Sequence, residues 1–122
     1  MATKFRLLVV DDGPILRQAL RDQFELEGYD VDEAEDGSVA IDRIQRKPYD
    51  LITLGLKMQR VDGIEVLRWM KTLSHPPKVI MLTGVNDVRI DIECKKLGVK
   101  DYITKPFDWK DLFATVQRVL GS

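Results

Sequence analysis

Short apolar runs alternate with longer amphipathic segments along the whole chain. The apolar runs occupy residues 5–10, 29–34, 50–54, 78–82 and 100–103. Segments with apolar residues at helical spacing follow them, at about 14–27, 37–45, 63–73, 87–97 and 108–120. A strand followed by a helix, repeated five times, predicts a parallel sheet with helices on both faces. The chain is therefore expected to form an α/β sandwich of three layers.

Local signals support individual elements. The runs at 7–10 and 79–82 are apolar without alternation, as expected of strands that are buried on both faces. Pro14 suits the first position of a helix, and Gly28 and Gly98 follow predicted helix ends, where a left-handed residue is common. The helix that begins at Pro14 is expected to bury one apolar face, formed by Ile15, Leu16, Ala19, Leu20 and Phe24.

The composition is typical of a globular protein. Of the 122 residues, 44% are hydrophobic and 32% are charged, and the formal net charge is −1. No basic tract indicates nucleic-acid binding, and the run at 7–10 is too short for a membrane span or a signal segment. The single cysteine, Cys94, excludes a disulfide framework. We therefore expect one domain, residues 1–122, in the cytoplasm, with neither nucleic acid nor membrane as a partner.

Polar residues stand where three of the predicted strands end. Asp11 and Asp12 follow the first strand, Thr83 follows the fourth, and Lys105 follows the fifth. The carboxyl ends of parallel strands form the ligand crevice of such sheets. Taken singly, Asp12 fits a helix cap, Thr83 a turn and Lys105 a solvated lysine. Together they indicate a shared site, and the adjacent acids suit a hard cation unless Lys105 neutralises them.

Three segments carry a resemblance to a known family. Residues 7–12 read LLVVDD, residues 79–84 read VIMLTG, and residues 97–107 read LGVKDYITKPF. With this spacing the chain resembles the receiver domains of response regulators in two-component signalling. The resemblance implies a doubly wound, flavodoxin-like fold: a five-stranded parallel sheet of order 2-1-3-4-5 with five helices.

The resemblance also implies roles for the residues at the strand ends. It makes Asp11 and Asp12 ligands of Mg²⁺, with the backbone carbonyl of Lys57 as a further ligand. It makes the hydroxyl of Thr83 a contact of the phosphoryl group and Lys105 the cation that reads its charge. No organic cofactor and no enzyme activity are implied.

The resemblance extends to the switch and to the interaction surface. The bond between Lys105 and Pro106 is typically cis in the family, and Tyr102 matches an aromatic whose rotamer follows activation. Receivers bind signalling proteins, a histidine kinase or a downstream effector, through the face formed by helix four, strand five and helix five. A homodimer through this face is compatible with the sequence.

Two features of this chain bear on that face. Val88 and Ile92 fall nearly opposite a second apolar stripe of the fourth helix, which consists of Ile90, Cys94 and Leu97. Only one stripe can face the sheet, so Val88 and Ile92 are expected to be exposed, unless the helix is tilted and both stripes are partly covered. Trp109 is a second candidate contact, or it covers the edge of the domain.

The resemblance breaks at Gly55, where family members carry the aspartate that accepts the phosphoryl group. Asp50-Leu51 before it and Asp62-Gly63 after it match the family and set the alignment. Glycine offers no nucleophile for acyl-phosphate formation. It also removes one anionic ligand, so Mg²⁺ is expected to bind weakly. Lys57, Gln59 and Arg60 also depart from the pattern, which favours a natural atypical receiver over an engineered non-phosphorylatable form.

Three classes of function remain in view. The first is a binding module that acts as a switch without phosphorylation. The second is a phosphoacceptor that uses a neighbouring side chain, Asp11, Asp12 or Thr53. The third, a flavodoxin-like binder of flavin or nucleotide, requires a phosphate-cradling loop after the first strand, whereas the acids at that place repel phosphate. The first class is favoured.

Overall fold

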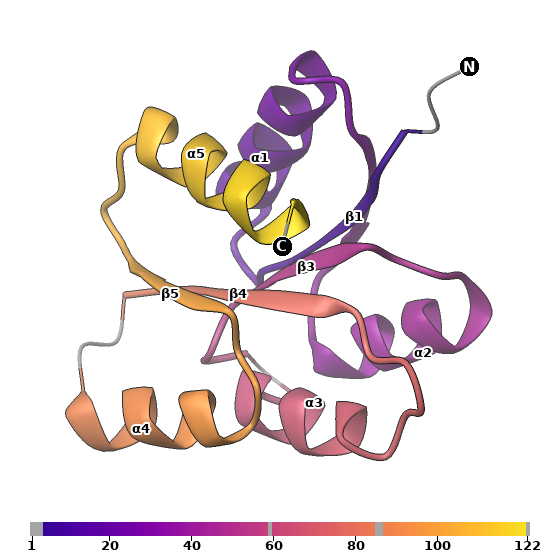
Figure 1. The fold of residues 1–122 in the computed structure, drawn as a ribbon, viewed down its shortest axis with the longest axis vertical. Coiled ribbons are helices and arrows are strands. Elements are labelled where there is room, and N and C mark those ends of the chain that lie inside the picture. Colours follow the sequence, from indigo (N-terminus) through magenta and orange to yellow (C-terminus); the bar gives the residue numbers. More distant parts are fainter. Residues whose placement is uncertain (1–3, 59, 85–86, 122) are drawn as a thin grey trace.

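A computed structural model describes residues 4–58, 60–84 and 87–121 (Figure 1). Within these residues, five strands alternate with five helices: β1 (Arg6–Val10), α1 (Pro14–Leu26), β2 (Asp30–Ala34), α2 (Gly37–Arg46), β3 (Leu51–Leu54), α3 (Gly63–Met70), β4 (Lys78–Thr83), α4 (Val88–Lys96), β5 (Asp101–Thr104) and α5 (Trp109–Leu120). All strand pairs are parallel, in the order β2-β1-β3-β4-β5. The expected fold class and strand order are confirmed.

The predicted element boundaries agree with the structure to within three residues. The largest difference is at α3, which ends at Met70 instead of Leu73. The amides of Thr72 and Leu73 bond to carbonyls only three residues back, at 3.0 Å each, so the chain tightens into turns after Lys71.

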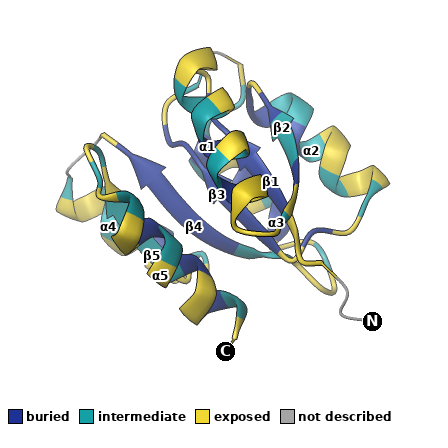
Figure 2. Ribbon diagram, turned by 90° about the horizontal axis from the view of Figure 1, so that it is seen from above, coloured by how far each residue is buried: buried dark blue, intermediate teal, exposed yellow. Residues whose placement is uncertain are grey.

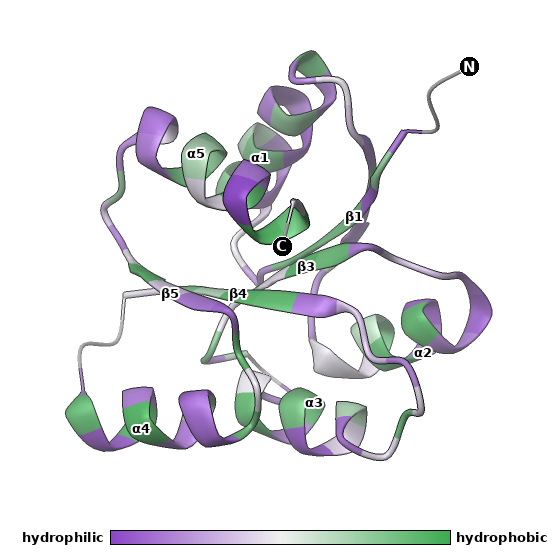
Figure 3. Cartoon of the chain, in the orientation of Figure 1, coloured by the Kyte–Doolittle hydropathy of each residue, from purple (hydrophilic) through white to green (hydrophobic). Residues whose placement is uncertain are grey.

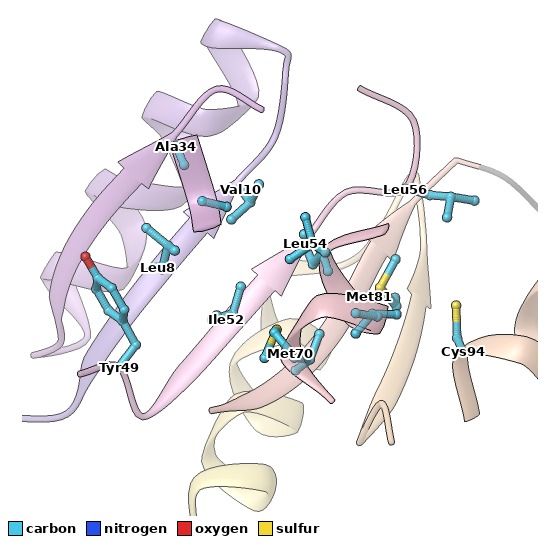
Figure 4. Close-up of a cluster of buried hydrophobic side chains, with 14 residues drawn as sticks. Leu8, Val10, Ala34, Tyr49, Ile52, Leu54, Leu56, Met70, Met81 and Cys94 are labelled. Carbon is cyan, nitrogen blue, oxygen red and sulfur yellow. The ribbon is translucent and has the colours of Figure 1, made fainter. Parts of the chain in front are cut away.

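The sheet separates two hydrophobic cores. Helices α1 and α5 cover one face, and α2, α3 and α4 cover the other (Figure 1). Alternate residues of β1 serve the two cores: Leu7 and Val9 pack with α1 and α5, while Leu8 and Val10 pack with the other three helices (Figure 4). The central strands β1, β3 and β4 are accordingly mostly buried, the edge strands β2 and β5 are partly exposed, and the outer sides of the helices are exposed (Figure 2).

The buried face of α1 differs from the prediction at one residue. Leu20 and Phe24 are buried and Leu16 packs against them, but Ile15 is 85% exposed. At 3.6 residues per turn, Ile15 lies about 180° around the helix from Phe24, so it faces away from the sheet. The prediction for Ile15 was wrong because Ile15 and Leu16 are neighbours, and the rotation of α1 about its own axis decides which of them faces the sheet.

Helix ends follow the local chemistry of the sequence. Four helices, α2, α3, α4 and α5, begin after an aspartate whose carboxylate accepts hydrogen bonds from backbone amides of the first turn. Gly28 and Gly98 have φ of +95° and +90°, as predicted for residues that close helices. The strands are rich in hydrophobic residues and the helices alternate hydrophobic with hydrophilic ones (Figure 3), and hydrophobic residues of both pack in the two cores. None of the helices in the described ranges has the length and apolar character needed to cross a membrane.

Candidate functional site

A pocket of about 210 Å³ opens at the carboxyl ends of the central strands. Its lining consists of Asp11, Asp12, Gly55, Leu56, Lys57, Leu82, Thr83, Gly84 and Lys105. The lining contains the predicted metal ligands, Thr83 and Lys105, together with Gly55, whereas Pro106, which was predicted for the same pocket, is not part of it. Parallel strands end at the same edge of the sheet, which is why residues as far apart in sequence as Asp11 and Lys105 meet there.

Asp11 is held in place through all three of its oxygen atoms. It is 4% exposed. Its Oδ1 accepts from the amide of Gly13 and its Oδ2 from Lys105 Nζ, each at 2.8 Å. Its backbone carbonyl accepts from Arg17 Nη1, also at 2.8 Å. The Asp11 carboxylate is therefore both fixed and neutralised by a lysine before any ligand arrives.

Asp12 differs from its neighbour. It is exposed, and within the described residues Lys105 pairs with Asp11 alone, so the alternative that Lys105 neutralises the acids holds only for Asp11. The N-cap of α1 is Gly13, and within the described residues no side chain caps this helix. The helix-cap alternative for Asp12 is therefore wrong.

Arg17 supports Asp11 from α1, a contact that the sequence analysis missed. Its Nε lies 3.2 Å from Glu33 Oε1 on β2, and Glu33 Oε2 also bonds to Arg21 Nη1 at 3.0 Å. The strand end that carries Asp11 is thus tied to α1 and β2 together. Arg17 and Glu33 are 16 residues apart, and only the packing of α1 beside β2 joins them.

Gly55 lies beside this ion pair and is buried. Its amide donates to the carbonyl of Val10 at 2.9 Å. A Cβ built on Gly55 would lie 3.3 Å from that carbonyl oxygen and 3.6 Å from Asp11 Oδ2. A side chain at position 55 would therefore start next to the Asp11 carboxylate, with a small adjustment at Val10.

The loop between β3 and α3 closes tightly over Gly55. The amide of Gly63 donates to the carbonyl of Leu56 at 2.8 Å. A Cβ on Gly63 would lie 2.4 Å from the carbonyl oxygen of Gly55. Since no real side chain tolerates that distance, Gly63 is required for the loop to return so close to its start.

Arg60 anchors the same loop to the start of α2. Its Nε and Nη2 donate to Asp36 Oδ2 at 2.9 and 2.7 Å, while Asp36 Oδ1 caps α2 by accepting from the amides of Ser38 and Val39. Burial by itself would raise the pKa of Asp36. The hydrogen bonds that it accepts outweigh burial and lower this pKa to about 2. The sequence singled out Arg60 as unusual without indicating its partner; Gln59 lies outside the described residues.

Thr83 and Lys105 come from the two remaining strand ends. Thr83 closes β4 and is 4% exposed at the pocket wall. The bond between Lys105 and Pro106 is cis, as predicted. Tyr102, on β5, is half-buried between β5 and α4. Burial raises the pKa of its hydroxyl, and the nearby Cys94 adds to this effect.

The outer surface of α4 carries the predicted apolar pair. Val88 is 71% exposed and Ile92 is 48% exposed. Cys94 is fully buried on the opposite stripe, where Ile90 and Leu97 pack against the core. The prediction that Val88 and Ile92 are exposed is confirmed.

Trp109 is half-buried in an aromatic cluster. Its ring centroid lies 5.1 Å from that of Phe107 in an edge-to-face arrangement and 5.9 Å from that of Phe113. This packing supports the second of the two roles considered for Trp109, covering the domain edge.

The ligands available for a metal ion fall short of a complete set. In the part of the chain that the structure describes, no group of three or more His, Cys, Asp or Glu side chains is placed to hold a metal. Asp11 already bonds to Lys105 and to Gly13, and Asp12 is the pocket's other carboxylate. Mg²⁺ requires near-octahedral oxygen ligands and usually one or two carboxylates. As arranged, the pocket fits Mg²⁺ poorly.

Comparison with known proteins gives a consistent result. The pattern of the response regulator receiver domain matches residues 7–117. Protein CcdB of Bacillus subtilis is 38% identical over 117 residues, which are 95% of this chain and 98% of that protein. The probable transcriptional regulator ycf27 of Porphyridium aerugineum is also 38% identical, over 96% of this chain and 48% of its own length. The chain therefore spans about half the length of several relatives and nearly all of others.

Solved structures agree. A CheY-like response regulator receiver domain protein from Methanospirillum hungatei superimposes with a TM-score of 0.93 at 26% sequence identity, over 98% of this chain and 95% of that one. The similarity extends over the whole sheet and all five helices described above.

Proposed function

Because this chain belongs to the response regulator receiver family, we propose that it is a receiver that acts without phosphorylation, as a protein-interaction switch in two-component signalling. The observation that carries the proposal is the location of Gly55. It lies in the pocket beside Asp11 and Lys105, where the family's acceptor aspartate belongs, and it offers no nucleophile.

The neighbouring side chains are poor substitutes for that aspartate. Both carboxylate oxygens of Asp11 already accept hydrogen bonds, one from Gly13 and one from Lys105. The hydroxyl of Thr53 is buried within β3 without a hydrogen-bond partner, in a residue that is 1% exposed, so a phosphodonor cannot reach it without local unfolding. Asp12 is exposed but has no ion-pair partner among the described residues that would position it. The phosphoacceptor alternative therefore has little support.

Magnesium has a minor place in this proposal. Asp12 and the backbone carbonyl of Lys57 are the groups left to hold it, with Asp11 available only if Lys105 moves. A cation bound in this way is weakly held. Neither an organic cofactor nor an enzyme activity forms part of the proposal.

Partner binding is assigned to the face formed by α4, β5 and α5. Val88 and Ile92 expose apolar surface on α4, and Tyr102 of β5 lines the same pocket as Val88. Exposed apolar clusters of this kind favour contact with another protein. The partner is a histidine kinase, a downstream effector or a second copy of this chain, and the proposed location is the cytoplasm.

A phosphodonor experiment tests the loss of the acceptor. The native chain is incubated with acetyl phosphate and Mg²⁺ and its intact mass is measured. We expect no stable adduct; a stoichiometric gain of one phosphoryl group would disprove the proposal, and peptide mapping would identify the acceptor. Restoring the carboxylate with Gly55→Asp separates the two origins of the loss. Signalling in cells that this variant leaves unchanged supports a natural atypical receiver, whereas signalling that appears only in the variant indicates an engineered loss of function.

A further inference from the structure

A second pocket, of about 370 Å³, lies at the opposite end of the sheet from Gly55. It is enclosed by the C-terminal ends of α3 and α4 and by the start of β4. Its volume falls within the range of about 300–1,000 Å³ that is common for small-molecule sites. Nothing in the receiver function proposed above depends on this pocket.

The lining of this pocket is mostly apolar. Six apolar side chains form its walls: Leu67, Met70, Pro76, Pro77, Val79 and Leu97. Three lysines and Gly98 complete the lining: Lys71, Lys78 and Lys100. No acidic residue is among these lining residues, although the chain as a whole has more acids than bases. The pocket thus combines an apolar interior with a cationic edge.

Two of the three ammonium groups are available to a ligand. Lys78 Nζ is engaged, because it donates to the carbonyl of Val119 at 3.0 Å. For Lys71 and Lys100, the described residues provide no side-chain hydrogen-bond or ion-pair partner. Lys71 Nζ extends from α3 across to α4, where it lies 3.9 Å from the place that a Cβ on Gly98 would occupy. Lys100 lines the same edge two residues further on.

We propose that this pocket binds a small amphipathic carboxylate. The apolar body of the ligand would displace water from the walls around Met70 and Leu97, where burial of apolar surface is favourable. The carboxylate would lie between Lys71 and Lys100 and form charge-assisted hydrogen bonds with them. Lysines near helix C-termini also counter the helix dipole. That role explains the charges of these lysines but not the apolar hollow between them.

The first experiment compares three probes with the same alkyl chain. Sodium octanoate, octylammonium chloride and 1-octanol, each below its micelle concentration or solubility limit, are titrated into the ¹⁵N-labelled full chain. We expect octanoate to shift the amide signals of Lys71, Gly98 and Lys100 saturably, and the other two probes to bind at least about fivefold more weakly. The signal of Gly55, at the other end of the sheet, should not move. Equal binding of octylammonium, or shifts spread over the surface, would overturn the proposal.

The second experiment uses matched lysine variants. Lys71→Ala and Lys100→Ala are each expected to weaken octanoate binding by about fivefold or less, and Lys71→Glu to reverse the preference toward octylammonium. Lys96→Ala is the control because it removes the same charge. Lys96 is exposed at the end of α4 and does not line the pocket. If the variants lower the melting temperature yet leave the order of the three probes unchanged, these lysines serve only the helix dipole and the proposal fails. These experiments measure binding at this pocket only, so their result does not depend on whether the chain signals without phosphorylation. The two proposals can therefore be disproved separately.

Discussion

The pocket at Gly55 buries a charged side chain, whereas the outer surface of α4 exposes apolar ones. In the pocket, Asp11 is buried, paired with Lys105 and further fixed by Arg17. On α4, Val88 and Ile92 present apolar side chains to solvent. The pocket neutralises the charge of Asp11 with Lys105, whereas the surface of α4 leaves apolar side chains uncovered. The proposed function therefore predicts that binding through α4 does not depend on chemistry in the pocket.

The largest expected effect comes from restoring a carboxylate at position 55. The space beside Asp11 admits a Cβ with a small adjustment, so Gly55→Asp should fold and become phosphorylated by acetyl phosphate with Mg²⁺. Mg²⁺ affinity should rise at least about tenfold, because a third carboxylate joins the pocket. Intact mass and Mg²⁺ titration measure the two effects.

Gly55→Asn is the matched control for that variant, since the asparagine side chain has the same shape and no anionic nucleophile. It should gain neither property. A Gly55→Asp protein that folds, binds Mg²⁺ and still accepts no phosphoryl group would show that more than the acceptor is missing from this pocket.

Removing Lys105 should have the next largest effect, on stability. Lys105→Met leaves the Asp11 carboxylate buried without its cation. Buried pairs that lose one partner cost about 3–5 kcal/mol, but the Lys105 side chain is 30% exposed, so we expect about 2 kcal/mol in urea unfolding. Combining Asp11→Asn with Lys105→Met should recover part of the loss; a double variant less stable than Lys105→Met would argue against the pair as the cause.

Acid should weaken the anchor of the loop over Gly55. The pKa of Asp36 is lowered from 3.8 to about 2 in the folded protein, so its ionised form stabilises the fold above pH 3.8. That contribution should be lost as the pH falls from about 4 toward 2. The free energy of unfolding should depend less on pH across this range in Asp36→Asn, because asparagine cannot titrate. If the free energy of unfolding of Asp36→Asn depends on pH as steeply as that of the native chain, groups other than Asp36 cause the acid sensitivity.

The smallest effect on stability is expected on α4. Val88→Asp and Ile92→Asp alter exposed side chains and should change the free energy of unfolding by no more than about 0.5 kcal/mol. Binding to a signalling partner should nevertheless fall, because a charge replaces apolar contact area. Pull-down or signalling output measures this. Ile15→Asp serves as the control, since Ile15 is an exposed apolar residue on α1, away from this face.

The sequence allowed the fold and most of the pocket to be predicted. Strand-helix alternation indicated the sheet, and the polar residues at the strand ends identified Asp11, Thr83 and Lys105, because parallel strands bring their carboxyl ends to one edge. Exposure of Val88 followed from helical periodicity. These signals are local, or depend only on the order of the strands.

Other contacts could not be found in this way. Arg17 meets Glu33, and Arg60 meets Asp36, only because separate elements pack side by side. The exposure of Ile15 likewise depended on how α1 is rotated against the sheet. Long charged side chains reach many positions, so spacing in the sequence does not select a partner for them.

By itself, the sequence determined the α/β architecture, the edge of the sheet that carries the polar residues and the lack of a side chain at position 55, since each depends on residue type and element order. Tertiary structure alone decided which acid Lys105 neutralises, how the loop over Gly55 is anchored and that Lys71 and Lys100 line one apolar hollow between α3 and α4. Those outcomes depend on distances between elements that are far apart in the chain, and only packing sets such distances.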